Sequence, residues 1–190
     1  MLTRNTLLAV AILVGSASGL SAQDRKGFGM SFGLGWGSAG LTCAECEIQT
    51  DERVEGLAGY VRLGGHANPH LFVGVEGTGW LKNSEGVERR IASASFVTLV
   101  YPSASAGFFL HGGFGGIRAV IENDLISVVG TGVTWQAGAG IDIPVGTGAA
   151  ITPYVTYLAS SSVAADVNGL SAGLNLNPNI LQAGLALTVR

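Results

Sequence analysis

The sequence predicts an all-β fold, an eight-stranded antiparallel up-and-down transmembrane β-barrel, from three observations. The 190 residues include 30 glycines, and glycine disfavours helix interiors. Only 12% of the residues are charged, about half the usual share of a soluble domain, and the mean hydropathy is +0.43. Apolar residues alternate with small or polar residues along most of the chain, which is the period of a strand with two different faces. Together these features argue against a helical bundle and an ordinary soluble domain.

The first 22 residues have the layout of a secretory signal peptide. Arg4 gives a positive start, Leu7–Val14 form an apolar run, and the segment ends on the small residues Ser21 and Ala22. The apolar run is too short for a membrane-spanning helix. We therefore expect a signal peptide at 1–22, cleaved after Ala22 or alternatively after Gly19, and a single barrel domain at 23–190. A retained N-terminal anchor is the competing interpretation.

Eight segments beyond residue 26 alternate with period two. In Gly27–Gly37, the large apolar residues fall on one face and glycine and serine on the other. The other seven strands are expected around residues 57–63, 71–82, 91–101, 108–114, 133–143, 151–157 and 181–189. In the fourth segment we assign to the apolar, lipid-facing side Ile91, Val97, Leu99 and Tyr101.

The connections between these strands alternate in length. Those after the second, fourth and sixth strands are short, at 66–69, 102–106 and 144–148. The others are mostly longer, at 38–52, 83–88, 121–127 and 160–177. Outer-membrane barrels have short periplasmic turns and longer outside loops, and an even strand number leaves both termini in the periplasm. The barrel must close, because an open sheet edge in lipid leaves backbone groups without hydrogen bonds.

The face opposite the apolar one predicts a filled interior. An eight-stranded barrel is only wide enough to be filled by side chains. Arg62 and Glu76 lie on adjacent strands near the same register, so we expect them to pair, and we expect no open solute channel. Polar side chains assigned to the barrel interior are Tyr60, Arg62, Glu76, His111, Gln136 and Asp142.

Arg118 is the one charged residue that falls on the lipid-facing parity. We expect it either to lie beyond the membrane or to follow a β-bulge at Gly115-Gly116, which would reverse the faces.

The layout of Gly27–Arg190 resembles the small outer-membrane β-barrel proteins of Gram-negative bacteria, the OmpA/OmpX-like group with the outer membrane protein beta-barrel domain. Members of this group usually finish on an aromatic residue, whereas this chain finishes Val189-Arg190. The resemblance implies a place in the outer membrane, contact with its lipid, and insertion by the barrel-assembly machinery; it brings no catalytic residues. The residues that match the C-terminal signal for that machinery are Gln182, Gly184, Leu187 and Val189.

Cys43 and Cys46 are the two cysteines of the chain and lie in the first long connection. In an oxidising compartment they most simply form a disulfide. A redox-active C-x-x-C would begin a helix in a βαβ unit, which the sequence does not predict. A zinc site would need two further ligands, for which nearby carboxylates are a weak signal.

Other chemistry-bearing motifs have simpler structural explanations. Gly35–Gly40 matches G-x-G-x-x-G, but neither a following helix nor an acidic partner supports a dinucleotide site. The spacing around His111 shows no Ser–His–Asp arrangement, and we expect this histidine to fill the interior. The net charge of −3 gives no basic footprint for nucleic acid. We therefore expect no cofactor, no metal and no enzymatic activity.

Three functions are compatible with a barrel of this size. The first is an integral outer-membrane barrel with a plugged interior and a structural or surface-interaction role through its exposed loops, whose partners the sequence leaves unknown. The second is an exported, soluble, lipocalin-like barrel, which would need an apolar interior and a polar exterior. The third is a lipid-acting barrel enzyme; such enzymes have an N-terminal amphipathic helix, for which residues 23–26 leave no room.

Overall fold

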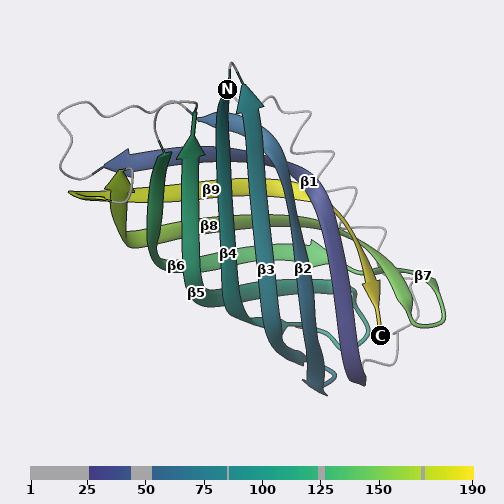
Figure 1. The fold of residues 1–190 in the computed structure, drawn as a ribbon. Coiled ribbons are helices and arrows are strands. Elements are labelled where there is room, and N and C mark those ends of the chain that lie inside the picture. The colour runs from purple at the N-terminus through teal and green to yellow at the C-terminus, as the bar shows by residue number, and fades with distance from the viewer. Residues whose placement is uncertain (1–25, 44–52, 85, 124–126, 168–169) are drawn as a thin grey trace, which may run out of the picture.

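The structure is a computed structural model that describes residues 26–43, 53–84, 86–123, 127–167 and 170–190. Nearly all of these residues lie in antiparallel strands (Figure 1). Within the described ranges, no helix is long and apolar enough to cross a membrane. The strands are β1 (Gly27–Cys43), β2 (Val54–Asn68), β3 (Leu71–Ser84), β4 (Val87–Val100), β5 (Phe108–Glu122), β6 (Ser127–Ile141), β7 (Ile143–Gly146), β8 (Ala149–Val167) and β9 (Leu170–Val189).

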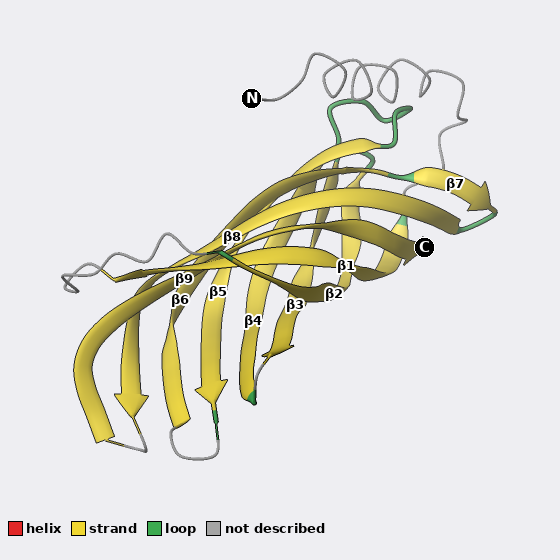
Figure 2. Ribbon diagram, turned by 90° about the horizontal axis from the view of Figure 1, so that it is seen from above, coloured by secondary structure: helices red, strands yellow, loops and turns green. Residues whose placement is uncertain are grey.

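The sheet closes on itself into a barrel. Consecutive strands pair with one another, except that β6 pairs with β8 and not with β7. The first strand also pairs with the last, with Gly35 opposite Gly184 on β9. Strand β7 continues β6 beyond Asp142, and both pair with β8, so together they count as one of the eight strands of the barrel. Figure 2 shows the strands wrapped into one continuous layer. The predicted eight-stranded up-and-down barrel is therefore confirmed.

The two ends of the barrel differ in what they carry. The proximal end holds Gly27, Arg190 and the turns that join β2 to β3, β4 to β5, and β7 to β8. The distal end is the opposite one, where β1–β2, β3–β4, β5–β6 and β8–β9 are connected. The expected exported signal peptide, residues 1–22, lies outside the described residues.

The outer surface of the barrel is apolar. Leu34 on β1 is 70% exposed and Phe114 on β5 is 67% exposed, although both are large hydrophobic side chains. Similar residues face outward on the other long strands, including Trp36, Val75, Phe96, Trp135 and Leu185. The opposite face buries serine, threonine and charged side chains. A soluble lipocalin-like barrel needs the reverse arrangement, so that alternative is wrong.

The buried side chains of the interior lie in three layers. The distal layer is apolar and includes Trp80, Leu158 and Ile180. The central layer combines a polar network with Tyr60 and Tyr154. The proximal layer is again apolar and consists of Phe72, Val97, Leu99, Tyr101 and Phe109.

The proximal layer corrects the faces that the sequence predicts for β4. Val97 and Leu99 were expected to face lipid, yet they are only 2% and 3% exposed and point inward together with Tyr101. Phe96, expected inside, faces outward at 65% exposure and packs against Phe114, with ring centroids 6.1 Å apart. Both faces of this strand are apolar near its proximal end, so the period alone does not distinguish them; the register with β3 and β5 does.

One further expectation about the distal half, and the bulge that was one of two explanations for Arg118, are wrong. Residues 160–177 were expected to form a loop, but β8 continues to Val167 and β9 starts at Leu170, with register shifts between Ala159 and Ala164 and between Ala165 and Asp166. The ladder of β5 runs without a shift through Gly115-Gly116, so there is no bulge there. Arg118 therefore faces outward, in the distal third of its strand.

Candidate functional site in the barrel interior

A buried ion pair lies at the centre of the barrel. Arg62 on β2 and Glu76 on β3 are cross-strand register partners, and alternation directs both side chains inward. Nη2 of Arg62 lies 2.6 Å from Oε2 of Glu76, and Nε donates to the same oxygen at 2.6 Å. Their side chains are 4% and 1% exposed. The pairing predicted from the sequence is therefore present.

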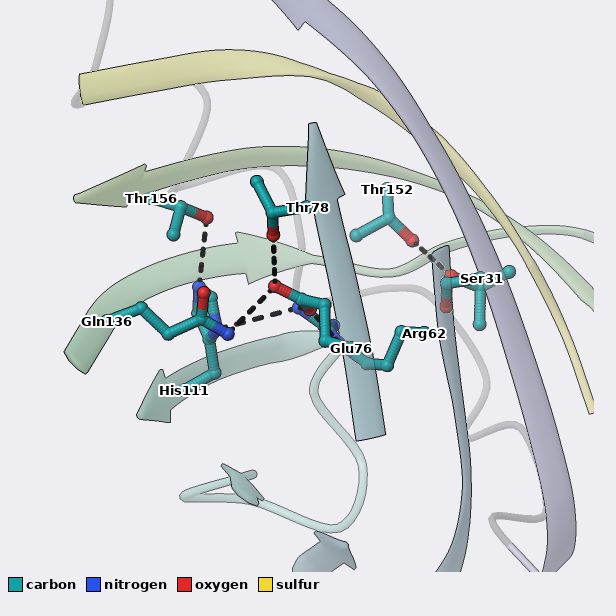
Figure 3. Close-up of polar contacts among 9 residues, drawn as sticks. Ser31, Arg62, Glu76, Thr78, His111, Gln136, Thr152 and Thr156 are labelled. Atoms are coloured by element: carbon teal, nitrogen blue, oxygen red, sulfur yellow. Dashed lines mark hydrogen bonds and ion pairs between the residues drawn. The ribbon is translucent and has the colours of Figure 1, made fainter. Parts of the chain in front are cut away.

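Further hydrogen bonds extend this pair across the barrel (Figure 3). Oε1 of Glu76 accepts from Nε2 of Gln136 on β6 at 2.8 Å and from the hydroxyl of Thr78 at 3.3 Å. Nη2 of Arg62 lies 3.5 Å from Nδ1 of His111 on β5. Nε2 of His111 in turn lies 3.1 Å from the hydroxyl of Thr156 on β8. The central network thus links β2, β3, β5, β6 and β8.

Two tyrosines complete the central layer. The guanidinium carbon of Arg62 lies 4.7 Å from the ring centroid of Tyr60, within the range of a cation–π interaction. Tyr60 packs edge-to-face on Tyr154, with centroids 4.8 Å apart. One positive and one negative charge therefore balance in a region of low dielectric, where an unpaired charge would be costly.

Asp142 forms a second polar group at the proximal end. Its carboxylate accepts from the hydroxyls of Thr152 at 2.7 Å and Tyr101 at 3.0 Å, and it pairs with the guanidinium of Arg190. The hydroxyl of Thr152 also lies 3.0 Å from that of Thr188. These bonds lie at the proximal end, next to the aromatic layer of Tyr101 and Phe109.

The structure thus brings together five of the six predicted interior residues and separates the sixth. Tyr60, Arg62, Glu76, His111 and Gln136 share the central layer, whereas Asp142 belongs to the proximal group. Sequence reasoning missed Arg190. The signal for it was parity, because a residue that follows the outward-facing Val189 must point inward.

The predicted C-terminal signal residues occupy both faces of β9. Gln182 is buried at 1% exposure, while Leu187 and Val189 are outward-facing at 49% and 41%. Gly184 lies opposite Gly35 in the seam between the first and last strands.

The expected disulfide cannot be placed on the fold. Cys43 is the last residue of β1, and Cys46 lies outside the described residues.

The central network consists of a guanidinium, a carboxylate, an imidazole, an amide and threonine hydroxyls. In the described ranges, no three His, Cys, Asp or Glu side chains are grouped so that they could hold a metal ion. His111 contacts a guanidinium and a threonine hydroxyl.

Comparison with known proteins rests on structure alone. No family model matches the chain. No curated protein matches it by sequence. Neisserial surface protein A (NspA) superposes with a TM-score of 0.62 at 11% identity, over 85% of this chain and 96% of NspA. The protein has the fold of the small outer-membrane β-barrels.

Two more solved structures share this fold. Ail, the attachment invasion locus protein of Yersinia pestis, superposes with a TM-score of 0.53 at 14% identity, over 85% of this chain and 99% of Ail. OprG of Pseudomonas aeruginosa gives 0.50 at 11% identity, over 87% of this chain and 98% of OprG. Together with the apolar exterior, the fold identifies an integral protein of the outer membrane.

Proposed function

We propose that the protein is a non-conducting outer-membrane barrel with a structural and surface-interaction role. Its interior is closed by its own side chains, and its distal connections are presented outside the cell. The orientation is supported by the even number of barrel strands, which puts the first and last residues of the barrel domain on the periplasmic side.

The observation that carries this proposal is the link from Arg62 through Glu76 to Gln136, because it crosses the barrel lumen. The apolar layers around Trp80 and Phe109 lie on either side of it. A hydrated ion would have to separate the ion pair and displace both layers. We therefore expect the barrel to block solutes.

Planar-bilayer recording tests the closed interior. We expect no stable conductance from the purified wild-type protein. A Tyr60→Ala/Arg62→Ala/Glu76→Ala variant, in which the central layer is emptied, is the positive control for what an open lumen would give. Reproducible single-channel steps from the wild type would overturn the proposal.

The surface role is proposed for the distal connections. Ail has been solved in complex with the heparin analogue sucrose octasulfate, so that protein of the same fold holds a sulfated ligand. The first distal connection of this chain carries Glu45, Glu47, Asp51 and Glu52, and its acidity favours a partner with positive charge or a divalent cation over a sulfated one. Replacing these four side chains by amides should weaken adhesion of whole cells to a cationic surface and leave the barrel folded.

Cys43 and Cys46 give a direct test of orientation and of the proposed disulfide. A membrane-impermeant maleimide added to intact cells should label the protein only after reduction. Labelling without reduction would show free thiols. Labelling confined to broken cells would place this connection in the periplasm and overturn the orientation.

Insertion by the barrel-assembly machinery is proposed from Gln182, Gly184, Leu187 and Val189. Leu187→Ser should lower the yield of inserted protein in cells while leaving refolding of the purified chain into detergent intact.

We also propose that the barrel is not an enzyme. Release of fatty acid or transfer of an acyl chain from phospholipid by the purified protein would contradict this.

A further inference from the structure

A cavity of about 330 Å³ lies inside the distal end of the barrel, above the three filled layers. Residues from β1, β2, β3, β4, β5 and β9 line it, so it spans much of the mouth. Most of its wall is apolar and includes Ala39, Val54, Trp80, Ile91, Ile121 and Pro178.

The floor of this mouth cavity is closed. Trp80 is 3% exposed, and its indole Nε1 donates to the carbonyl oxygen of Gly37 at 2.9 Å. Ala58, Leu158 and Ile180 pack in the same cluster. The cavity is therefore a blind pocket and not the entrance to a channel.

Two cations point toward the mouth, and no carboxylate of the described residues pairs with either. Arg89 lines the cavity, and its cross-strand register partner is Lys82. Each is two residues from an inward-facing side chain, Ile91 or Trp80, so alternation directs both into the barrel. Across the described ranges, neither side chain has a hydrogen bond or an ion pair. Like charges directly opposite one another on one face of a sheet destabilise it unless an anion lies between them.

Among the described residues, the carboxylates of β4 and β5 at this end of the barrel, Glu88 and Glu122, pair with an outward-facing arginine. Arg90, the neighbour of Arg89, points outward and pairs with both Glu88 and Glu122 at 3.2 Å. The outward charges of β4 and β5 are thus paired with one another, while Lys82 on β3 and Arg89 on β4 have no carboxylate partner among the described residues.

The geometry points to a binding site for a carboxylate with a single apolar chain, its head between Lys82 and Arg89 and its chain on Trp80. A guanidinium fork matches a carboxylate in shape as well as charge. The apolar wall favours an aliphatic chain and disfavours a sugar, whose hydroxyls would be left unpaired there. The volume is at the small end of the usual range for ligand pockets, about 300–1,000 Å³, and fits one short chain better than a lipid with several. The site goes beyond the proposed function and rests on it only for the direction in which the mouth opens.

Tryptophan quenching tests this site directly. The chain has three tryptophans, and two of them, Trp36 and Trp135, face outward at 57% and 49% exposure. Trp36→Phe/Trp135→Phe leaves Trp80 as the sole fluorophore. With this variant in phosphatidylcholine nanodiscs, decanoic acid brominated at the chain end should quench Trp80 saturably, and unlabelled decanoate should reverse the quenching.

Matched variants separate the two halves of the site. Lys82→Gln/Arg89→Gln should weaken binding by about tenfold or more, because the head loses both charges. Arg118→Gln removes an outward-facing charge from the same end of the barrel and should leave binding unchanged. Ala119→Phe should fill the cavity and abolish quenching although both cations remain. Heat-dependent mobility on SDS gels shows that each variant is folded.

Three outcomes would overturn the site. The first is quenching that does not saturate or is equal in the Lys82→Gln/Arg89→Gln variant, which would reflect partition into the bilayer. The second is competition by sucrose octasulfate, which would assign the cations to a polyanion. The third is binding that appears only after Glu45, Glu47, Asp51 and Glu52 are changed to amides, which would assign the cations to that segment. Channel activity in bilayers would contradict the plug and leave this result standing, so the two proposals fail separately.

Discussion

Arg62 and Glu76 are the residues on which the interior depends most, because each is almost fully buried and is the other's only opposite charge in the central network. Removing one member of a buried ion pair leaves an uncompensated charge at a cost of about 3–5 kcal/mol. We therefore expect Glu76→Gln to lower the free energy of unfolding by that order, measured by urea titration of the protein in lipid vesicles.

The double variant Arg62→Met/Glu76→Gln is the control for this prediction. It removes both charges, so it should lose clearly less stability than the sum of the two single variants. Strictly additive losses would mean that the two side chains are not coupled, in conflict with the 2.6 Å ion pair.

The outward-facing residues make a second prediction at this scale. Phe114 lies midway along β5 and is 67% exposed, which places it in the lipid-facing belt. An arginine at the centre of such a belt costs about 2–4 kcal/mol, and near an interface about 0–1 kcal/mol. Phe114→Arg should therefore destabilise the barrel in vesicles far more than Val145→Arg, because Val145 is also exposed, at 55%, but adjoins a proximal turn.

At the scale of the strand, the seam between β1 and β9 contains a close approach of two backbones. Gly184 faces Gly35 there, and a Cβ added to Gly184 would lie 2.7 Å from the Cα of Gly35. Backbones this close leave no room for a methyl group, and overpacking typically costs about 1–3 kcal/mol. Gly184→Ala should slow closure of the purified barrel and lower its stability.

Gly79 provides the matched control for the seam. It also lies within a strand, yet a Cβ added to it would meet nothing within 4 Å. Gly79→Ala should therefore leave folding rate and stability unchanged. An equal effect of the two substitutions would indicate a general role of glycine in these strands and would contradict a specific role of the seam.

The strands also show how far the sequence leads. The period of two, together with one charged residue on a face, was enough to orient β2 and β3, because Arg62 and Glu76 are tolerated only inside the barrel. No charge marks the proximal half of β4, and both of its faces are apolar, so Val97 and Leu99 were assigned to the wrong side. The distal extension of β8 and β9 was missed for a different reason. Beyond the membrane a strand no longer needs an apolar face, and residues 160–177 carry no such signal.

The candidate site shows the same limit. Register from short turns predicts pairs such as Arg62 and Glu76, which lie on consecutive strands. Contacts between distant strands follow only from closure, so the bond from Gln136 to Glu76 and the pairing of Arg190 with Asp142 were not predictable. Lys82 and Arg89 were within reach, because both flank one hairpin, but their significance depends on the cavity they face.

At the scale of the whole molecule, closure makes the barrel a single cooperative unit. With β6 and β7 counted as one, every strand of the barrel pairs with a neighbour on both sides. No free edge therefore offers a place for stepwise unfolding. We therefore expect the protein to keep its fold in SDS until it is heated. Outer-membrane fractions run on a gel boiled and unboiled should give two mobilities, the unboiled form differing from the unfolded chain. The boiled sample should regain the first mobility after refolding into detergent, which rules out chemical damage as the cause. A single mobility under both conditions, with the protein recovered in the soluble periplasmic fraction, would contradict a closed membrane barrel. A heat-sensitive barrel embedded in the outer membrane would give neither result.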